Sequence, residues 1–219
     1  MTIFETHRLL KLAADKADKG YFPPEELDDF LDMASRWLFT EYKPFYGKDR
    51  DKTAALLPFK ESYDFTSNSS GVFSIVTANV YVEKLSLSAS VFNNDLNITE
   101  YFDIDFINDD ERAQRLNSQL RKVDTTSPVV EETIPGTFQI YPKQVTGGTV
   151  RFLREPKKPL FAYTQVGRVI THNAGASQDL EWTGMYLNKV IMKALTLMGI
   201  TLDNSWLREN GMGLQQSNV

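Results

Sequence analysis

Few side chains in this chain are suited to catalysis, and the histidines are the first to consider. The sequence has two histidines and no cysteine, which excludes a disulfide framework, a cysteine-ligated metal site and a thiol nucleophile. A serine nucleophile needs a histidine base and an orienting carboxylate. We expect His7 on a helix and His172 in a loop, and no serine has the sequence context of a nucleophile elbow. The pattern does not favour serine hydrolysis.

Acidic residues raise two other possibilities, a cation site and a catalytic carboxylate pair. Asp103 and Asp105, followed by Asn108, resemble the start of a calcium loop, but the glycine at the sixth position and the closing acid are missing. Strand alternation would put both aspartates on one exposed face, so we expect no metal site and no bound cofactor. The separation of paired carboxylates is a spatial quantity, so a carboxylate-dependent soluble enzyme stays open as an alternative.

Glycine-rich and basic stretches point to structure more than to ligand binding. Gly147-Gly148 is not followed by Lys-Ser or Lys-Thr, so it predicts a hairpin turn and not a phosphate loop. Residues 143–168 carry six bases and one acid, with aromatic residues between them, a pattern also found in nucleic-acid contacts. The formal net charge is −5, which disfavours tight phosphate binding. We therefore expect a basic strand face that meets an acidic face elsewhere.

The elements that would position these residues begin with a helical arm over residues 1–60. Thr2 and Glu5 have capping-box spacing, and Gly20 offers a helix end. A second amphipathic helix should begin near Pro24, and the short connection predicts an antiparallel pair. No apolar run reaches 18 residues and the start is charged throughout, so we expect neither a membrane span nor a secretory signal.

Residues 71–219 are expected to form a β-rich domain. The apolar residues from Leu85 to Val91 alternate with serines, which predicts a strand with one buried and one hydrated face. Other short strands follow, separated by turn sequences such as Pro135-Gly136. Short strands at this spacing are typical of an antiparallel sandwich or barrel. The predicted fold class is therefore α+β.

Two further helices interrupt and close this domain. The first, at about 109–122, follows a segment 100–111 that has six acids and no base, while 112–122 has four bases and no acid. This order complements the helix dipole. The second, at about 184–199, is apolar on most of its circumference and should be covered on more than one side. With Trp182 and Trp206 nearby, we expect surface that another chain covers.

Several motifs carry a family resemblance that covers about residues 100–202. They are DDERAQRLNSQL at 109–120, Ser127-Pro128, FQIYPK at 138–143, VRFLREP at 150–156 and DLEW at 179–182. This set is similar to the virion neck proteins of crAss-like tailed bacteriophages. The chain departs from the family pattern at Leu180, where phenylalanine is usual, and in a longer loop rich in glycine, alanine and serine before it.

The resemblance implies a structural role without enzymatic activity. It implies a head–tail connector subunit below the phage portal, in a closed ring of about twelve copies that contacts the portal and other neck or tail proteins. Packaged DNA would pass through this ring without sequence-specific binding, and the protein would reach the virion after synthesis in the host cytoplasm, without a membrane partner. Another tail component, such as a tail-fibre or tail-tube adaptor, stays open as an alternative.

A ring subunit must present two different surfaces to its two neighbours. We expect the acidic run 100–111 of one subunit to meet a basic run of the next, 112–122 or 143–168. For Arg112, Arg115 and Asn117, bracing within one subunit is an equally open interpretation. The predicted interface residues are Asp103, Asp105, Arg112, Arg115, Asn117, Arg151, Arg154 and Trp182.

Overall fold

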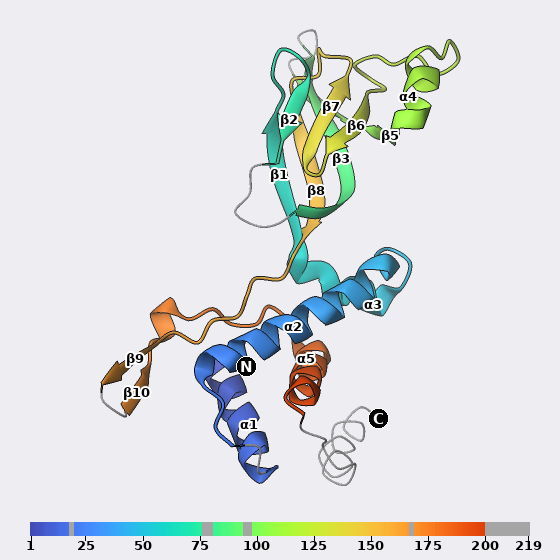
Figure 1. Ribbon diagram of the computed structural model, residues 1–219. Coiled ribbons are helices and arrows are strands. Elements are labelled where there is room, and N and C mark those ends of the chain that lie inside the picture. Colours follow the sequence, from blue (N-terminus) through green and yellow to red (C-terminus); the bar gives the residue numbers. More distant parts are fainter. Residues whose placement is uncertain (18–19, 76–80, 94–97, 167–168, 200–219) are drawn as a thin grey trace. The chain divides into compact units, whose positions relative to one another are not determined.

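The computed structural model describes residues 1–17, 20–75, 81–93, 98–166 and 169–199 (Figure 1). It confirms the predicted α+β class, because helices and mixed β-sheets are both present. Trp206 and the C-terminal tail lie outside the described residues. No helix within the described ranges is long and apolar enough to cross a membrane.

The chain divides into two compact units at boundaries that differ from the expected ones. A helical unit contains Met1–Pro58 and Pro156–Val219, and a sandwich unit contains Phe59–Glu155. The C-terminal helix therefore belongs with the N-terminal helices and not with the β-rich domain. The sandwich begins about a dozen residues before the expected position 71, because a strand not expected from the sequence precedes it.

Four α-helices form most of the helical unit: α1 (Ile3–Lys16), α2 (Pro24–Tyr42), α3 (Arg50–Leu56) and α5 (Gly184–Leu197). The expected capping box is present at the start of α1, where the Thr2 N–H donates to Glu5 Oε2 at 2.8 Å and the Glu5 N–H donates to Thr2 Oγ1 at 3.3 Å. Pro24 occupies the first turn of α2. The unit also contains a hairpin, β9 (Tyr163–Val166) paired with β10 (Val169–His172).

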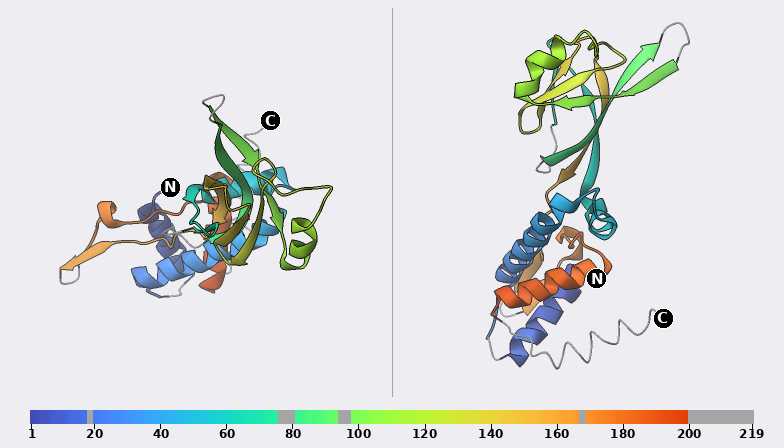
Figure 2. Two further views of the ribbon diagram at one scale, coloured as in Figure 1. Left: turned by 90° about the horizontal axis from the view of Figure 1, so that it is seen from above. Right: turned by 90° about the vertical axis from the view of Figure 1, so that its right-hand side faces the viewer.

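Helix α5 packs against α2 and α1, which explains why it joins the helical unit (Figure 2). Its buried side chains, Leu187, Val190, Ile191, Ala194 and Leu195, recur at helical spacing and lie on one face, so the expectation that this helix is covered on more than one side is wrong. The fully buried side chains of this unit include Leu10, Leu27, Leu31, Leu38, Val190 and Ala194. Neither amphipathic N-terminal helix would be stable alone, and α5 supplies the apolar surface that covers them.

Two four-stranded sheets make up the sandwich unit. The first has the order β1–β8–β3–β4, from β1 (Lys60–Thr66), β8 (Gly147–Arg154), β3 (Tyr81–Asn93) and β4 (Ile98–Asp103). The second has the order β2–β7–β6–β5, from β2 (Val72–Ser74), β7 (Thr137–Tyr141), β6 (Val129–Ile134) and β5 (Asp105–Ile107). Side chains of both sheets enclose one apolar core.

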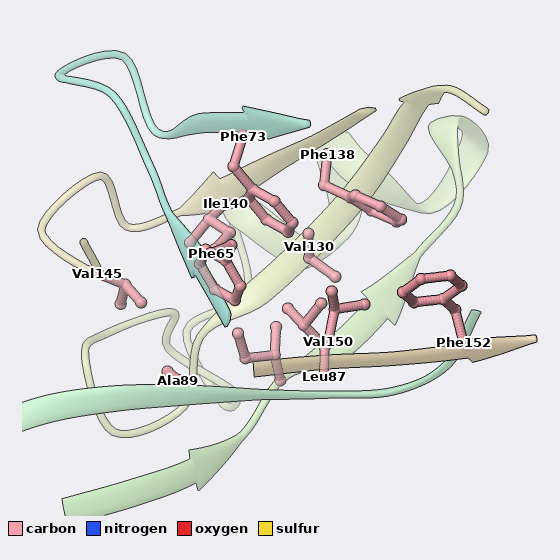
Figure 3. Packing of buried hydrophobic residues seen from close by; sticks show 11 residues of the cluster. Phe65, Phe73, Leu87, Ala89, Val130, Phe138, Ile140, Val145, Val150 and Phe152 are labelled. Atoms are coloured by element: carbon pink, nitrogen blue, oxygen red, sulfur yellow. The ribbon is translucent and has the colours of Figure 1, made fainter. Parts of the chain in front are cut away.

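That core contains aromatic and branched side chains from strands far apart in the sequence (Figure 3). The rings of Phe65 and Phe73 stack with centroids 3.9 Å apart, and Phe73 stacks on Phe138 at 5.1 Å. Leu87 and Ala89 are buried while Ser86, Ser88 and Ser90 in the alternate positions are half-buried, so the period-two pattern expected for this strand is confirmed at its centre. Close packing of this kind rigidifies the sandwich.

The chain changes sheets at Ile104, which corrects one expectation. Asp103 ends β4 in the first sheet and Asp105 begins β5 in the second, so the two aspartates do not share one strand face. The pair β5–β6 is parallel, whereas only antiparallel strands were expected. Parallel neighbours need a long crossover, and helix α4 (Asp109–Leu116) lies in this crossover.

Candidate assembly surfaces

The residues expected at a subunit interface divide into exposed and internally bonded groups. Asp103, Arg151 and Asn117 are exposed, and Asn117 is the C-cap of α4. The expected helix at about 109–122 ends earlier, at Leu116, and beyond it the Ser118 hydroxyl accepts the Arg121 N–H at 3.1 Å. These three exposed side chains remain candidates for contact with another molecule.

Arg115 and Arg112 brace α4 against its own sandwich unit. The Arg115 Nη2 atom lies 3.4 Å from Asp105 Oδ2, and its other terminal nitrogen donates to the Arg121 carbonyl oxygen. The Arg112 Nε atom lies 3.5 Å from Glu131 Oε2, although the Arg112 side chain is half exposed. Part of the charge segregation seen in the sequence is therefore satisfied within one chain, as the bracing interpretation expects.

Arg154 and Trp182 are buried inside single units, so the structure does not support the interface role expected for them. Arg154 Nε donates to Glu61 Oε1 at 2.6 Å. Trp182 is 2% exposed, and its indole N–H donates to Ser35 Oγ at 2.8 Å. Arginine and tryptophan are common at interfaces. Residue type alone does not reveal that the hydrogen-bond partner of Arg154 is 93 positions away and that of Trp182 is 147 positions away.

An acidic pair connects α4 to strand β6. Glu131 is almost fully buried, and hydrogen bonding with the Asp109 side chain, with burial as the second cause, raises the pKa of its carboxyl group. Arg112 opposes this shift. Burial and a neighbouring acid favour the protonated form. The sequence offers no signal for this pair, because Asp109 and Glu131 meet only through the crossover.

Both histidines of the chain meet at one aromatic ring, which the sequence does not reveal. His7 and His172 stack on Phe161 with centroids 4.6 and 4.7 Å from it. His7 Nε2 lies 2.8 Å from Asp28 Oδ1, and Asp28 Oδ2 accepts the Phe161 N–H at 2.9 Å. This buried cluster ties α1, α2 and the segment before β9 together.

His172 was expected in a loop but is the last residue of β10, and its geometry resembles a structural brace more than a catalytic dyad. Its Nε2 atom lies 2.9 Å from Ser177 Oγ. The Ser177 hydroxyl also accepts the Ala162 N–H at 3.1 Å and donates to the Asn173 carbonyl oxygen at 2.8 Å. A nucleophile would need a carboxylate to orient the imidazole, and the described contacts of His172 include none. The described residues also contain no group of three or more side chains suited to hold a metal.

Exposed apolar side chains concentrate on the helical unit. Among the described residues of the sandwich unit, the exposed large hydrophobic side chains are Tyr101, Leu120 and Ile134. The helical unit exposes many more, which include Phe4, Leu12, Met33, Trp37, Met185 and Val166. Scattered exposed hydrophobic residues are ordinary, but a concentration on adjacent helices is typical of an interaction surface.

Two shallow grooves lie within this surface. One, of about 480 Å³, is lined by α2 and α5 residues that include Trp37, Tyr42 and Met192. There Lys193 Nζ lies 4.3 Å from the Trp37 ring centroid. The other, of about 340 Å³, is lined by α1 residues and Phe161. Both are open and largely apolar, which suits contact with a protein surface better than enclosure of a small reacting molecule.

A scan against protein-family models finds no match, and a search of the curated proteins finds none either.

Proposed function

We propose that this chain is a structural virion protein that forms a ring at the head–tail connection of a tailed phage. The proposal rests on the resemblance of residues 100–202 to neck proteins and on the surface of the helical unit. The motifs of the resemblance that fall in the sandwich unit occupy α4, β7 and β8. Strands β7 and β8 contribute buried core side chains, whereas α4 has no buried residue and is held to the sandwich by the ion pairs of Arg112 and Arg115.

The single observation that carries the proposal is the apolar surface of the helical unit. A monomer seldom exposes this many large hydrophobic side chains on adjacent helices, because each exposed apolar area loses the free energy that burial would provide. Covering that surface with copies of the same chain restores this free energy. A closed ring also leaves no subunit with an uncovered face.

Exposed acidic charge fits a position around passing DNA. The net charge of −5 gives like-charge repulsion with the phosphate backbone, which discourages DNA from sticking to the ring. Contacts with the portal and with other neck or tail proteins would hold the ring in place. A basic channel face would contradict this part of the proposal.

Light scattering coupled to size-exclusion chromatography, on the full chain alone and mixed with the portal protein, tests the assignment. We expect a discrete, closed oligomer, either alone or on addition of the portal protein, and a ring in negative-stain images. A chain that stays monomeric at all concentrations and does not bind the portal protein would overturn the proposal. Electron cryomicroscopy of virions then distinguishes a neck ring from a tail-fibre or tail-tube adaptor by the layer that the protein occupies.

A further inference from the structure

Helix α1 presents one exposed stripe that is both apolar and basic. Phe4, Arg8 and Leu12 are four residues apart and therefore share one side of the helix, and Phe4 and Leu12 are about half exposed. Arg8 and Lys11 line the 340 Å³ groove beside them together with one acid, Asp15, and Phe161 forms a wall. Among the described residues, neither Arg8 nor Lys11 forms an ion pair, although Lys11 lies 5.9 Å from the Tyr21 ring centroid. We call Phe4, Arg8, Lys11 and Leu12 the α1 face.

Helix α2 presents an exposed stripe of the opposite charge. Met33 and Trp37 are 55% and 45% exposed, and they follow the exposed acids Glu26 and Asp29 on the same helix. Asp29 forms an ion pair with Lys158 at 2.6 Å, but both side chains are more than half exposed, so the pair contributes little and leaves Asp29 accessible. We call Glu26, Asp29, Met33 and Trp37 the α2 ridge.

We propose that the α1 face of one copy of this chain binds the α2 ridge of the next copy. The inference rests on the proposed ring and names the two surfaces that would close it. Met33 is a flexible side chain that fills irregular apolar grooves well, and the groove beside Phe4 and Leu12 offers such a place. Glu26 and Asp29 would then approach Arg8 and Lys11.

The charges of the α1 face and the α2 ridge favour a contact between two different surfaces over a contact between two copies of the same surface. Arg8 and Lys11 outnumber the one acid of the α1 groove, Asp15, and Glu26 and Asp29 outnumber Lys158, which pairs with Asp29. Two copies of the same surface therefore repel each other through this excess charge. Self-complementary pairing of either surface is therefore disfavoured, while the mixed pairing is attractive. A contact between two different surfaces repeats around an axis and gives a ring when the rotation closes.

Charge reversal on each surface tests the inference in the full chain. We expect Arg8→Glu combined with Lys11→Glu to weaken self-association about tenfold or more, and Glu26→Lys combined with Asp29→Lys to do the same, because each places like charges in contact. The chain that carries all four substitutions should regain most of the association, since the charges are again opposite. Circular dichroism and tryptophan fluorescence confirm that each variant is folded.

Lys60→Glu is the matched control, because it reverses an exposed charge of the sandwich unit at a residue that is not predicted at an interface. It should leave association unchanged. If the wild type assembles and the α1 and α2 variants assemble equally well, the inference is wrong while the ring proposal stands. Failure of the four-fold variant to regain association, when each pair of substitutions abolishes it, also rejects the mixed pairing. A wild-type chain that never assembles, with or without the portal protein, counts against the ring itself.

Discussion

At the scale of single residues, Asp28 is the polar centre of the helical unit. It is 3% exposed, and its two carboxylate oxygens contact different partners, His7 Nε2 and the Phe161 N–H. A buried polar group costs free energy unless it is hydrogen-bonded, and both oxygens here are satisfied. Asp28 therefore fixes the position of Phe161, which forms a wall of the groove on the α1 face.

Asp28→Asn should destabilise the helical unit by about 1–3 kcal/mol, because the amide has one acceptor oxygen where two are used. The adjacent change Asp29→Asn removes an exposed ion pair and should cost less than about 0.5 kcal/mol. Urea unfolding followed by tryptophan fluorescence measures both, since none of the three tryptophans lies in the sandwich unit. Equal effects of the two variants would contradict this role of Asp28.

Glu131 makes the sandwich unit sensitive to pH. Its pKa is raised from the ordinary value of 4.5 by hydrogen bonding with Asp109 and by burial. The native state therefore holds this proton more tightly than the unfolded chain does. The contribution of Glu131 to stability is fully present below about pH 4.5 and is lost as pH rises through the raised pKa.

Glu131→Gln replaces the carboxyl group with a neutral amide of similar shape. The free energy of unfolding of the variant minus that of wild type should therefore increase as pH rises above 4.5. Urea unfolding at about pH 4.5 and about pH 7.5, followed by circular dichroism, measures this, and tryptophan fluorescence identifies the transition of the helical unit. Glu132→Gln removes an acid that lies 3.4 Å from Lys84 and serves as the control. If the free energy of unfolding of Glu131→Gln differs from that of wild type by the same amount at both pH values, Glu131 does not make the sandwich unit sensitive to pH.

The contacts of individual side chains were the features that the sequence predicted least well. Asp103, Asn117 and Arg151, which were predicted at an interface, are exposed, and their interface role stays a prediction. Residue type could not reveal that Arg154 and Trp182 have internal partners, or that both histidines stack on Phe161. Those contacts join positions far apart in the chain, and local patterns contain no information about such pairing.

At the scale of elements, strand β8 is the centre of the first sheet. It pairs with β1 on one side and β3 on the other, and Gly148 lies opposite Phe65 of β1 and Ala89 of β3. A Cβ atom at Gly148 would lie 2.1 Å from the Ser88 carbonyl oxygen and 2.8 Å from the Phe65 ring. The absence of a side chain is therefore a packing requirement here. The hairpin turn expected at Gly147-Gly148 is wrong, because both glycines lie within β8, and β7 before it belongs to the other sheet.

Gly148→Ala should destabilise the sandwich unit by more than about 2 kcal/mol, because the backbone of β3 or the ring of Phe65 must move. Gly147→Ala is the matched control, since its Cβ would lie 3.4 Å from Ser90 Oγ and 3.6 Å from the Phe65 carbonyl oxygen, at or close to ordinary contact distance. Hydrogen–deuterium exchange of peptides from residues 59–155 measures the loss in that unit alone. Comparable protection in the two variants would show that the site tolerates a methyl group.

Elements with a strong local pattern were predictable, and those defined by pairing were not. The capping box, the start of α2 and the alternation in β3 followed from side-chain periodicity. Strand β1 was missed because only Tyr63 and Phe65 of its seven residues are apolar in the alternating positions. The sheet change at Ile104 and the parallel pair β5–β6 were missed because strand direction depends on the crossover.

At the scale of the whole molecule, the sandwich unit is an insertion within the helical unit. It has its own apolar core, and it begins and ends with strands that pair with each other. Lys60 lies opposite Leu153 in the antiparallel pair β1–β8, so the two ends of the insertion lie side by side. Units inserted through adjacent ends are often tolerant of removal, because the host chain has only a short gap to close.

Replacement of residues 59–155 with a flexible linker of about six glycine and serine residues should therefore leave the helical unit folded. We expect helical circular dichroism and a cooperative urea transition by tryptophan fluorescence at a midpoint close to that of the full chain. A chain that unfolds without cooperativity would mean that the helical unit depends on the sandwich. Because the α1 face and the α2 ridge lie entirely in the helical unit, the shortened chain should also self-associate, and Arg8→Glu combined with Lys11→Glu should weaken that association as much as we expect in the full chain.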